Sequence, residues 1–303
     1  MRNATIAVYR LRGIATETIK NIVLAGIGKL VVVDTEDVSA EDLGAGFFFR
    51  DEDVGKKRVD AAKSRIESLN PLVKVETISD PAALQSEHVH ALVQTVDLVC
   101  VTDWDRETLL RINKITRELQ KPLYTGGTYG LLGYIFCDLL AHDFIAPDRT
   151  NTKDTSKSVK TTATYTSLDN ALGHSWGNLN RRQTKELNPA VVFLILSLWE
   201  YQSRHSGALP DDDSATKELG DIAISLLTKA EVNKQALPTI PQDLVESLSI
   251  TAAHEISPVC AVVGGMLAQD ILKALAAREA PIANFFTFDG STGGGTVCRL
   301  GLP

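Results

Sequence analysis

Apolar positions along the first 34 residues form three blocks with two different spacings. Residues 5–8 are a continuous apolar run, and apolar side chains then recur at helical spacing over 14–27. A second continuous run covers 30–33 and ends at Asp34. Short β-branched runs of this kind are typical of parallel strands that are buried on both faces. The pattern therefore predicts a β-α-β unit.

The alternation of strand and helix patterns continues to about residue 140. Strands are expected at 73–78, 96–102 and 133–140, and helices at 56–69 and 105–119. We place a glycine-rich turn at Gly126 and Gly127. This alternation predicts an α/β fold, a Rossmann-like, doubly wound, mostly parallel sheet with helices on both faces.

The alternation of strand and helix patterns ends near residue 142, and patterns of the core fold return at 258. Residues 142–257 are predicted to be a helix-rich insertion or connection, with an edge strand at 159–165 and helices at 189–201 and 216–230. Residues 258–303 are predicted to return to the core fold through a long apolar helix, 258–277, and a C-terminal β-hairpin. We therefore expect residues 1–303 to form a single domain.

The loop after the first strand lacks the glycines that a nucleotide-binding unit carries there. Those glycines allow a tight turn and let the backbone approach the phosphates. Arg10, Arg12 and Ala15 stand in their places, and only Gly13 is left. One interpretation is a unit that has lost its nucleotide, and the other is a modified anion site, because arginine binds phosphate. Asp34 has the spacing of the acidic residue that holds a ribose in dinucleotide folds.

Composition narrows the class of protein. With 303 residues, 44% of them hydrophobic, the chain is expected to be globular, with one large core or two modest ones. No apolar run is near the ~20 residues of a membrane span and no secretory leader is evident, so we expect an intracellular protein without membrane contacts. The net charge of -7 argues against nucleic acid as a partner.

The cysteines and histidines do not form a metal-binding pattern. The four cysteines are far apart and lack a C-x-x-C pair, so we predict buried, reduced thiols. Cys260 meets the requirements of an activated thiolate only superficially. His88 and His90 are interpreted as a surface feature rather than as a metal pair. We predict no catalytic residue and no metal ligand.

Several segments resemble the adenylation fold of the enzymes that activate ubiquitin-like proteins, the E1 family. They are KNIVLAG at 20–26, VDTEDVS at 33–39, DVGK at 53–56 and SLNP at 68–71. The C-terminal segments resemble one branch, the smaller, non-catalytic subunits of SUMO-activating enzymes. They are PVCAVVGG at 258–265, QDI at 269–271 and NFFTFDG at 284–290. The resemblance covers nearly the whole chain in the right order.

Competent members of this family adenylate a ubiquitin-like protein with Mg-ATP, and the resemblance implies that the ATP-contacting groups are largely replaced here. Val32 occupies the first position of the family's Asp-x-Asp pair, and Asp42 and Leu43 stand for its asparagine and arginine. Arg58 takes the place of the lysine in the next helix. With Asn113 aligned to the family asparagine, Trp104 lies where the magnesium-linked aspartate is expected, and Asp103 is one residue away.

The resemblance thus leaves Gly13, Asp34 and Arg58 as remnants of a nucleotide site that holds no cofactor. It implies an obligate heterodimer with a catalytic subunit that binds Mg-ATP and carries the thioester cysteine, for which this chain has no room. SUMO and an E2 would be engaged through the complex, in the nucleus and secondarily in the cytoplasm. Family members also carry a preceding segment of the type YDRQIRLWG, and we expect that this sequence starts late.

Five residues are candidates for the subunit interface, which we expect to be apolar and to bury on the order of 2,000 to 5,000 Å². Phe47, Phe48 and Phe49 form an unusual aromatic run. Gly264 and Gly265 lie inside the long C-terminal helix, where each costs roughly 1 kcal/mol relative to alanine. We therefore expect another element to pack very close to this pair.

Three other functions stay open. An autonomous ThiF-like adenylating enzyme would need the glycine loop and the lysine. The regulatory subunit of a NEDD8-activating enzyme would need a larger insertion than 142–201 provides. A dinucleotide-dependent oxidoreductase has Asp34 in its favour, and Arg10 and Arg12 against it.

Overall fold

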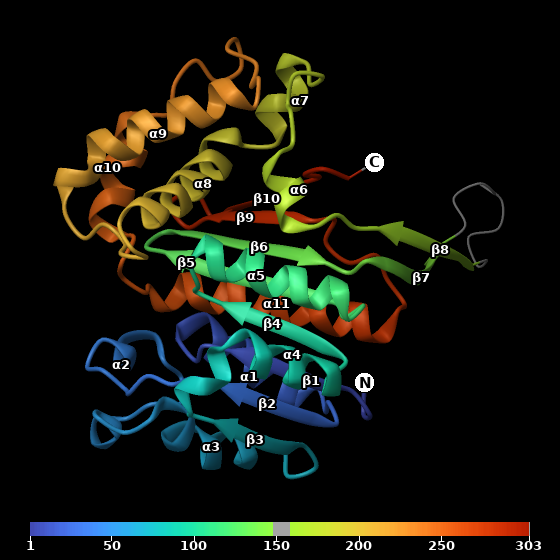
Figure 1. The fold of residues 1–303 in the computed structure, drawn as a ribbon. Coiled ribbons are helices and arrows are strands. Elements are labelled where there is room, and N and C mark those ends of the chain that lie inside the picture. Colours follow the sequence, from blue (N-terminus) through green and yellow to red (C-terminus); the bar gives the residue numbers. More distant parts are fainter. Residues whose placement is uncertain (148–157, 303) are drawn as a thin grey trace.

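The computed structural model describes residues 1–147 and 158–302 and centres on an eight-stranded sheet (Figure 1). The strand order is β10-β9-β6-β5-β4-β1-β2-β3. The strands are β1 (Thr5–Tyr9), β2 (Lys29–Val33), β3 (Lys74–Ile78), β4 (Leu98–Thr102), β5 (Leu123–Tyr129), β6 (Leu132–Asp138), β9 (Phe285–Asp289) and β10 (Gly294–Cys298). The strands from β3 to β5 are parallel, whereas β6, β9 and β10 pair antiparallel. The predicted fold class is confirmed.

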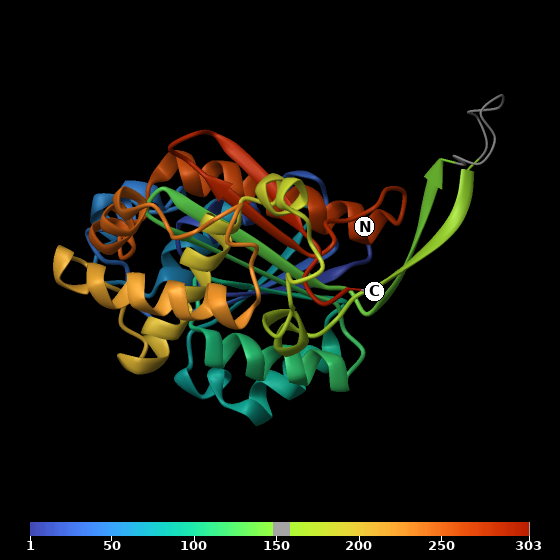
Figure 2. The same ribbon diagram turned by 90° about the horizontal axis from the view of Figure 1, so that it is seen from above.

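Helices cover both faces of the sheet, as the alternation of strand side chains requires. In β1, Ile6 and Val8 face one core, while Ala7 and Tyr9 face the other. The first core is closed by α1 (Gly13–Leu24), α3 (Arg58–Leu69) and α11 (Ser257–Ala276). The second is closed chiefly by α4 (Ser86–Thr95), α5 (Arg106–Glu118) and α8 (Pro189–Arg204). Figure 2 shows these layers from above, with α11 opposite α4 and α5.

Helices are present at 189–201 and 216–230, as predicted, but the strand expected at 159–165 lies elsewhere. β8 (Ser158–Thr164) pairs only with β7 (Ala141–Pro147), in a two-stranded ribbon that extends away from the body (Figure 2). The expected edge strand therefore does not join the main sheet. Residues 148–157, which belong to the predicted insertion, lie outside the described residues. The remaining helices here are α6 (Leu168–Leu172), α7 (Arg181–Glu186), α9 (Thr216–Lys229) and α10 (Gln242–Thr251).

The glycine-rich turn was placed wrongly, because Gly126 and Gly127 lie inside β5. A Cβ atom on Gly126 would come within 3.1 Å of Ile14 and Leu267, so this glycine lets α1 and α11 approach the strand. The chain instead turns at Gly130, whose φ of +57° suits a residue without a side chain.

Helix α11 corrects one sequence expectation and confirms another. By length and composition it is apolar enough to cross a membrane, yet half of that stretch is buried, as in the core helix of a soluble protein. A Cβ atom on Gly264 would lie 2.7 Å from Glu17 Cβ and 2.8 Å from the Ile14 carbonyl oxygen. The close packing expected at the glycine pair is thus confirmed at Gly264, against α1. Gly265 has no neighbour at that distance.

Candidate functional site

The loop between β1 and α1 holds its two arginines at the carboxyl ends of the parallel strands, where this fold class binds ligands. Arg10 has a left-handed backbone, with φ at +68°. Its guanidinium donates a hydrogen bond to the Asp103 carbonyl oxygen and lies 5.9 Å from the ring centre of Trp104. It also lies 3.7 Å from the Glu36 carboxylate. Arg10 therefore ties the loop to the ends of two neighbouring strands.

The N-terminus of α1 is occupied by the carboxylate of Glu255. Glu255 Oε1 accepts a hydrogen bond of 2.9 Å from the Gly13 backbone N–H and lies 3.6 Å from Arg12 Nε. A helix N-terminus attracts anions because its N–H groups and dipole point outward. In this chain the anion is supplied by a residue just before α11, far away in the sequence. Sequence reasoning missed Glu255, because the sequence around it does not indicate a contact with α1.

Gly13, the last glycine of the loop, is enclosed by the same elements. A Cβ atom placed on it would lie 2.9 Å from Cys260 Sγ, 3.0 Å from Ala45 Cβ and 3.2 Å from Glu255 Oε1. Gly13 is therefore retained for packing in this structure, and a phosphate group has no free approach to its N–H.

Asp34, predicted as a remnant of the ribose site, is buried and uses both oxygens within the chain. Oδ2 accepts a 2.6 Å hydrogen bond from the Leu11 N–H, and Oδ1 accepts a 2.7 Å hydrogen bond from the Glu36 N–H. Burial raises the pKa of Asp34, although these two hydrogen bonds and Arg58 oppose the shift. The carboxylate thus holds the loops after β1 and β2.

Arg58, the third predicted remnant, is buried at the start of α3 among three carboxylates. Its Nε donates a 3.0 Å hydrogen bond to Asp42 Oδ2, and Nη1 lies 3.6 Å from Asp34 Oδ2. Nη1 also pairs with Glu36. Burial lowers the pKa of Arg58, but Asp34 and Asp42 outweigh it and raise the pKa overall. The structure brings Asp34 and Arg58 together, while Asp42, expected only as a replaced position, proves to be a second carboxylate partner of Arg58.

Asp103 lies beside a pocket of about 250 Å³ that Arg10, Arg12 and Glu255 also line. Its Oδ1 accepts a 3.0 Å hydrogen bond from the Thr128 N–H. Burial, and next the negative charge of Glu255, raise the pKa of Asp103 to about 7.

The residues present do not fit Mg-ATP. Arg10, Arg12 and Arg58 already face carboxylates of the chain, and Glu255 holds the N–H group that a phosphate would need. A triphosphate would therefore meet negative charge in place of a cradle of N–H groups. In the described ranges no group of three or more His, Cys, Asp or Glu side chains could hold a metal ion.

The candidate interface residues divide into buried and accessible ones. Phe48, Phe49 and Gly264 are enclosed in this chain and pack within its core. Phe47 is 43% exposed, and the Lys20 ammonium lies 4.4 Å from its ring centre. Phe47 and the open side of Gly265 remain candidates, and their role in an interface stays a prediction.

In the described residues, neither the cysteine thiols nor the histidine pair has the surroundings of a reactive or metal-binding group. All four cysteines are free and buried, as predicted. Burial, and then Glu255, raise the pKa of Cys260 to about 12, which leaves its thiol protonated and unreactive at neutral pH. His88 and His90 lie on α4, outside any metal-type cluster in the part of the chain that the structure describes.

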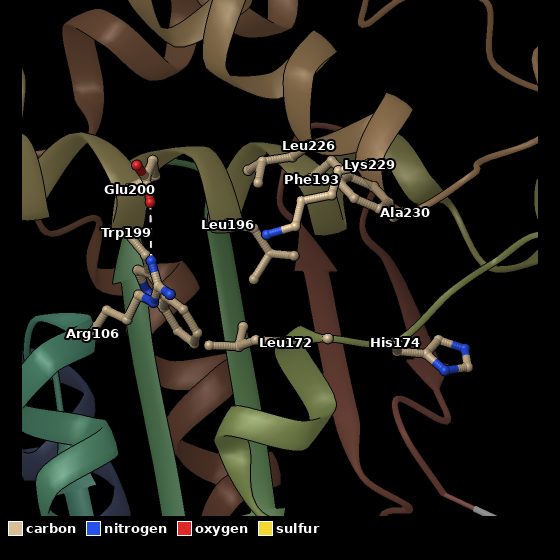
Figure 3. A pocket seen from close by; sticks show the side chains of 11 residues that line it. Arg106, Leu172, His174, Phe193, Leu196, Trp199, Glu200, Leu226, Lys229 and Ala230 are labelled. Atoms are coloured by element: carbon tan, nitrogen blue, oxygen red, sulfur yellow. Dashed lines mark hydrogen bonds and ion pairs between the residues drawn. The ribbon is translucent and has the colours of Figure 1, made fainter.

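A second pocket lies between α5, α6, α8 and α9 (Figure 3). Its volume is about 150 Å³, and aromatic and aliphatic side chains from α8 form much of its lining. An ion pair between Arg106 and Glu200, 2.9 Å apart, closes one end. Sequence reasoning singled out none of these residues.

Comparison with known proteins assigns the chain to a family. The ThiF family profile matches residues 1–302, so the chain belongs to the ThiF family. The chain is similar to the SUMO-activating enzyme subunit 1 of Bos taurus, with 31% identity over 319 residues that cover 99% of this chain and 90% of the relative. The same subunit of Xenopus laevis is 30% identical over 322 residues, with coverages of 99% and 90%.

A third relative is the DNA damage tolerance protein RHC31 of Saccharomyces cerevisiae. It is 32% identical over 322 residues, which cover 96% of this chain and 89% of the relative. The resemblance to the E1 adenylation fold over nearly the whole chain is confirmed.

Proposed function

We propose that this chain is the non-catalytic subunit of a heterodimeric SUMO-activating enzyme. Its fold is that of the ThiF family, and its relatives include SUMO-activating enzyme subunits 1. The observation that carries the proposal is the closed nucleotide site, in which Glu255 occupies the Gly13 N–H group and Asp42 neutralises Arg58. A domain that keeps the whole fold, but whose nucleotide site is occupied by its own side chains, is suited to support a catalytic partner.

In this proposal the partner binds Mg-ATP, adenylates SUMO and forms the thioester, while the present chain binds no cofactor. SUMO and an E2 are engaged through the complex, which acts in the nucleus and secondarily in the cytoplasm. Neither nucleic acid nor a membrane takes part. The alternatives are an autonomous ThiF-like enzyme and the regulatory subunit of a NEDD8-activating enzyme.

The solvent side of α11 is the surface that we assign to the catalytic partner. Ala261 and Val262 are exposed there, and Val262 is 43% accessible although it is apolar. Gly265, one helical turn after Ala261, leaves room for a close approach of another element. An uncovered apolar helix face of this kind supports a permanent interface, because such interfaces resemble a divided core.

Co-purification of the tagged chain with a catalytic E1 subunit tests this surface. Val262→Asp places a charge on it, and Ile224→Asp is the matched control, because Ile224 is 48% exposed on the unrelated helix α9. We expect Val262→Asp to abolish co-purification and Ile224→Asp to leave it unchanged. Equal recovery of both variants would exclude the α11 surface, and no recovery of the wild type would exclude the heterodimer.

A further inference from the structure

The pocket between α5, α6, α8 and α9 has no role in the proposed function and is separate from the remnant nucleotide site. We propose that it binds a small aromatic carboxylate, held by an apolar body in the pocket and by an ion pair with Lys229. This inference stands whether or not the chain belongs to a SUMO-activating enzyme, because it depends on the lining of the pocket alone.

The size of the pocket and its apolar walls select a compact apolar body. Phe193 and Trp199 are almost fully buried, and Leu196 and Leu226 form partly exposed walls. A dry apolar cavity of about 150 Å³ is large enough for benzene, and this pocket has about the same volume. A flat ring of benzene's size fits this volume, and its apolar contacts come from Leu196 and Leu226, because the buried aromatic residues expose almost none of their surface to a ligand.

The charges around the pocket select an anion. Arg106 is neutralised by Glu200, whose carboxylate is also 3.1 Å from Arg204. Among the described residues, no carboxylate oxygen forms an ion pair with Lys229 within 4.0 Å. In Figure 3 its side chain runs from α9 toward Leu196, over the middle of the pocket. Lys229 is therefore the cation that is left for a ligand.

His174 adds no charge to the site at neutral pH, because burial lowers its pKa. Its ring lies at the far end of the pocket from Arg106 and Glu200 (Figure 3). With the Arg106–Glu200 pair neutral, the lining carries a net charge of about one positive unit at pH 7, so a monoanion matches it and a dianion or a cation does not.

The probe is phenylacetate, with phenylacetamide as its neutral counterpart of the same shape. Binding to the full chain is measured by saturation-transfer difference NMR and by the change in tryptophan fluorescence, to which Trp199 contributes. A ligand of this size is expected to bind with a dissociation constant on the order of 1 mM. We expect phenylacetamide to bind roughly tenfold more weakly, because it cannot form a charge-assisted contact.

Lys229→Gln removes the cation, and Lys217→Gln is the matched control because Lys217 is exposed on the same helix, outside this pocket. We expect Lys229→Gln to weaken phenylacetate binding roughly tenfold, and Lys217→Gln to leave it unchanged. The proposal is wrong if phenylacetate shows no saturable binding up to millimolar concentrations. It is equally wrong if both variants bind alike, or if the amide binds as tightly as the carboxylate.

Discussion

Replacement of Arg58 by methionine removes the cation at the centre of the closed site. The Arg58 guanidinium is 3.0 Å from Asp42 and 3.6 Å from Asp34, and all three side chains are buried. At an effective dielectric constant of about 20, each of these pairs has a gross Coulomb energy of about 5 kcal/mol. Most of this energy is offset by the desolvation of the charges. Loss of one partner nevertheless leaves the others uncompensated, at a net cost of about 3 to 5 kcal/mol.

Urea unfolding followed by circular dichroism measures this cost. Lys57→Met is the matched control, because Lys57 is the preceding residue and pairs with Asp37 at 2.8 Å on the surface. Exposed pairs contribute about 0 to 1 kcal/mol, so we expect this control to change the free energy of unfolding by less than about 1 kcal/mol. If Arg58→Met also stays within about 1 kcal/mol of the wild type, the reasoning on the closed site is refuted.

The pH dependence of the free energy of unfolding provides a second test with Arg58→Met. Burial raises the pKa of Asp34, so this carboxylate takes up a proton at a higher pH than an ordinary aspartate does. The stabilisation by Arg58 requires ionised partners. The difference between the wild type and Arg58→Met is therefore expected to shrink as the pH falls from 7 toward 4, and a constant difference would contradict the assignment.

Three further predictions concern the same region. Glu255→Gln keeps a hydrogen-bond acceptor for Gly13 but removes the charge at the α1 N-terminus, so the free energy of unfolding in urea should fall by about 1 to 2 kcal/mol; an unchanged value would refute this role of Glu255. Because the pKa of Asp103 is raised to about 7, its contribution to stability is complete below about pH 4 and is lost as the pH rises to 7. Asp103→Asn should therefore flatten the decline of the melting temperature over that range, and an equally steep decline would contradict it. Gly264→Ala should cost about 1 to 3 kcal/mol through its contacts with α1, whereas Gly265→Ala should stabilise the chain by about 0.5 to 1 kcal/mol; equal effects in thermal unfolding would contradict the packing.

The parallel core of the fold could be predicted because its local patterns agree with its tertiary surroundings. The run at 30–33 is apolar at every position since β2 is buried on both faces. The same logic identified α11 and the hairpin of β9 and β10. The same logic fails at Gly126 and Gly127, because glycine occurs at close-packed positions as well as in turns. Only the positions of α1 and α11 decide between close packing and a turn.

The candidate site could be predicted only in outline. Arg10, Arg12 and Arg58 were visible as departures from a nucleotide-binding pattern, whereas the groups that neutralise them were not. Glu255 reaches Arg12 and Gly13 across most of the length of the chain, and Asp42 was interpreted only as a replaced residue. Such pairings depend on three-dimensional proximity, which has no local signature in the sequence.

A SUMO thioester assay with Mg-ATP tests the central claim most directly, run with this chain alone, the catalytic subunit alone, and both together. ATP–pyrophosphate exchange is followed in the same three samples, so that adenylation and thioester formation are separated. We predict full activity only when both chains are present, and neither exchange nor thioester formation by this chain alone. Exchange by the isolated chain, or full activity of the catalytic subunit without it, would contradict its assignment as a supporting subunit.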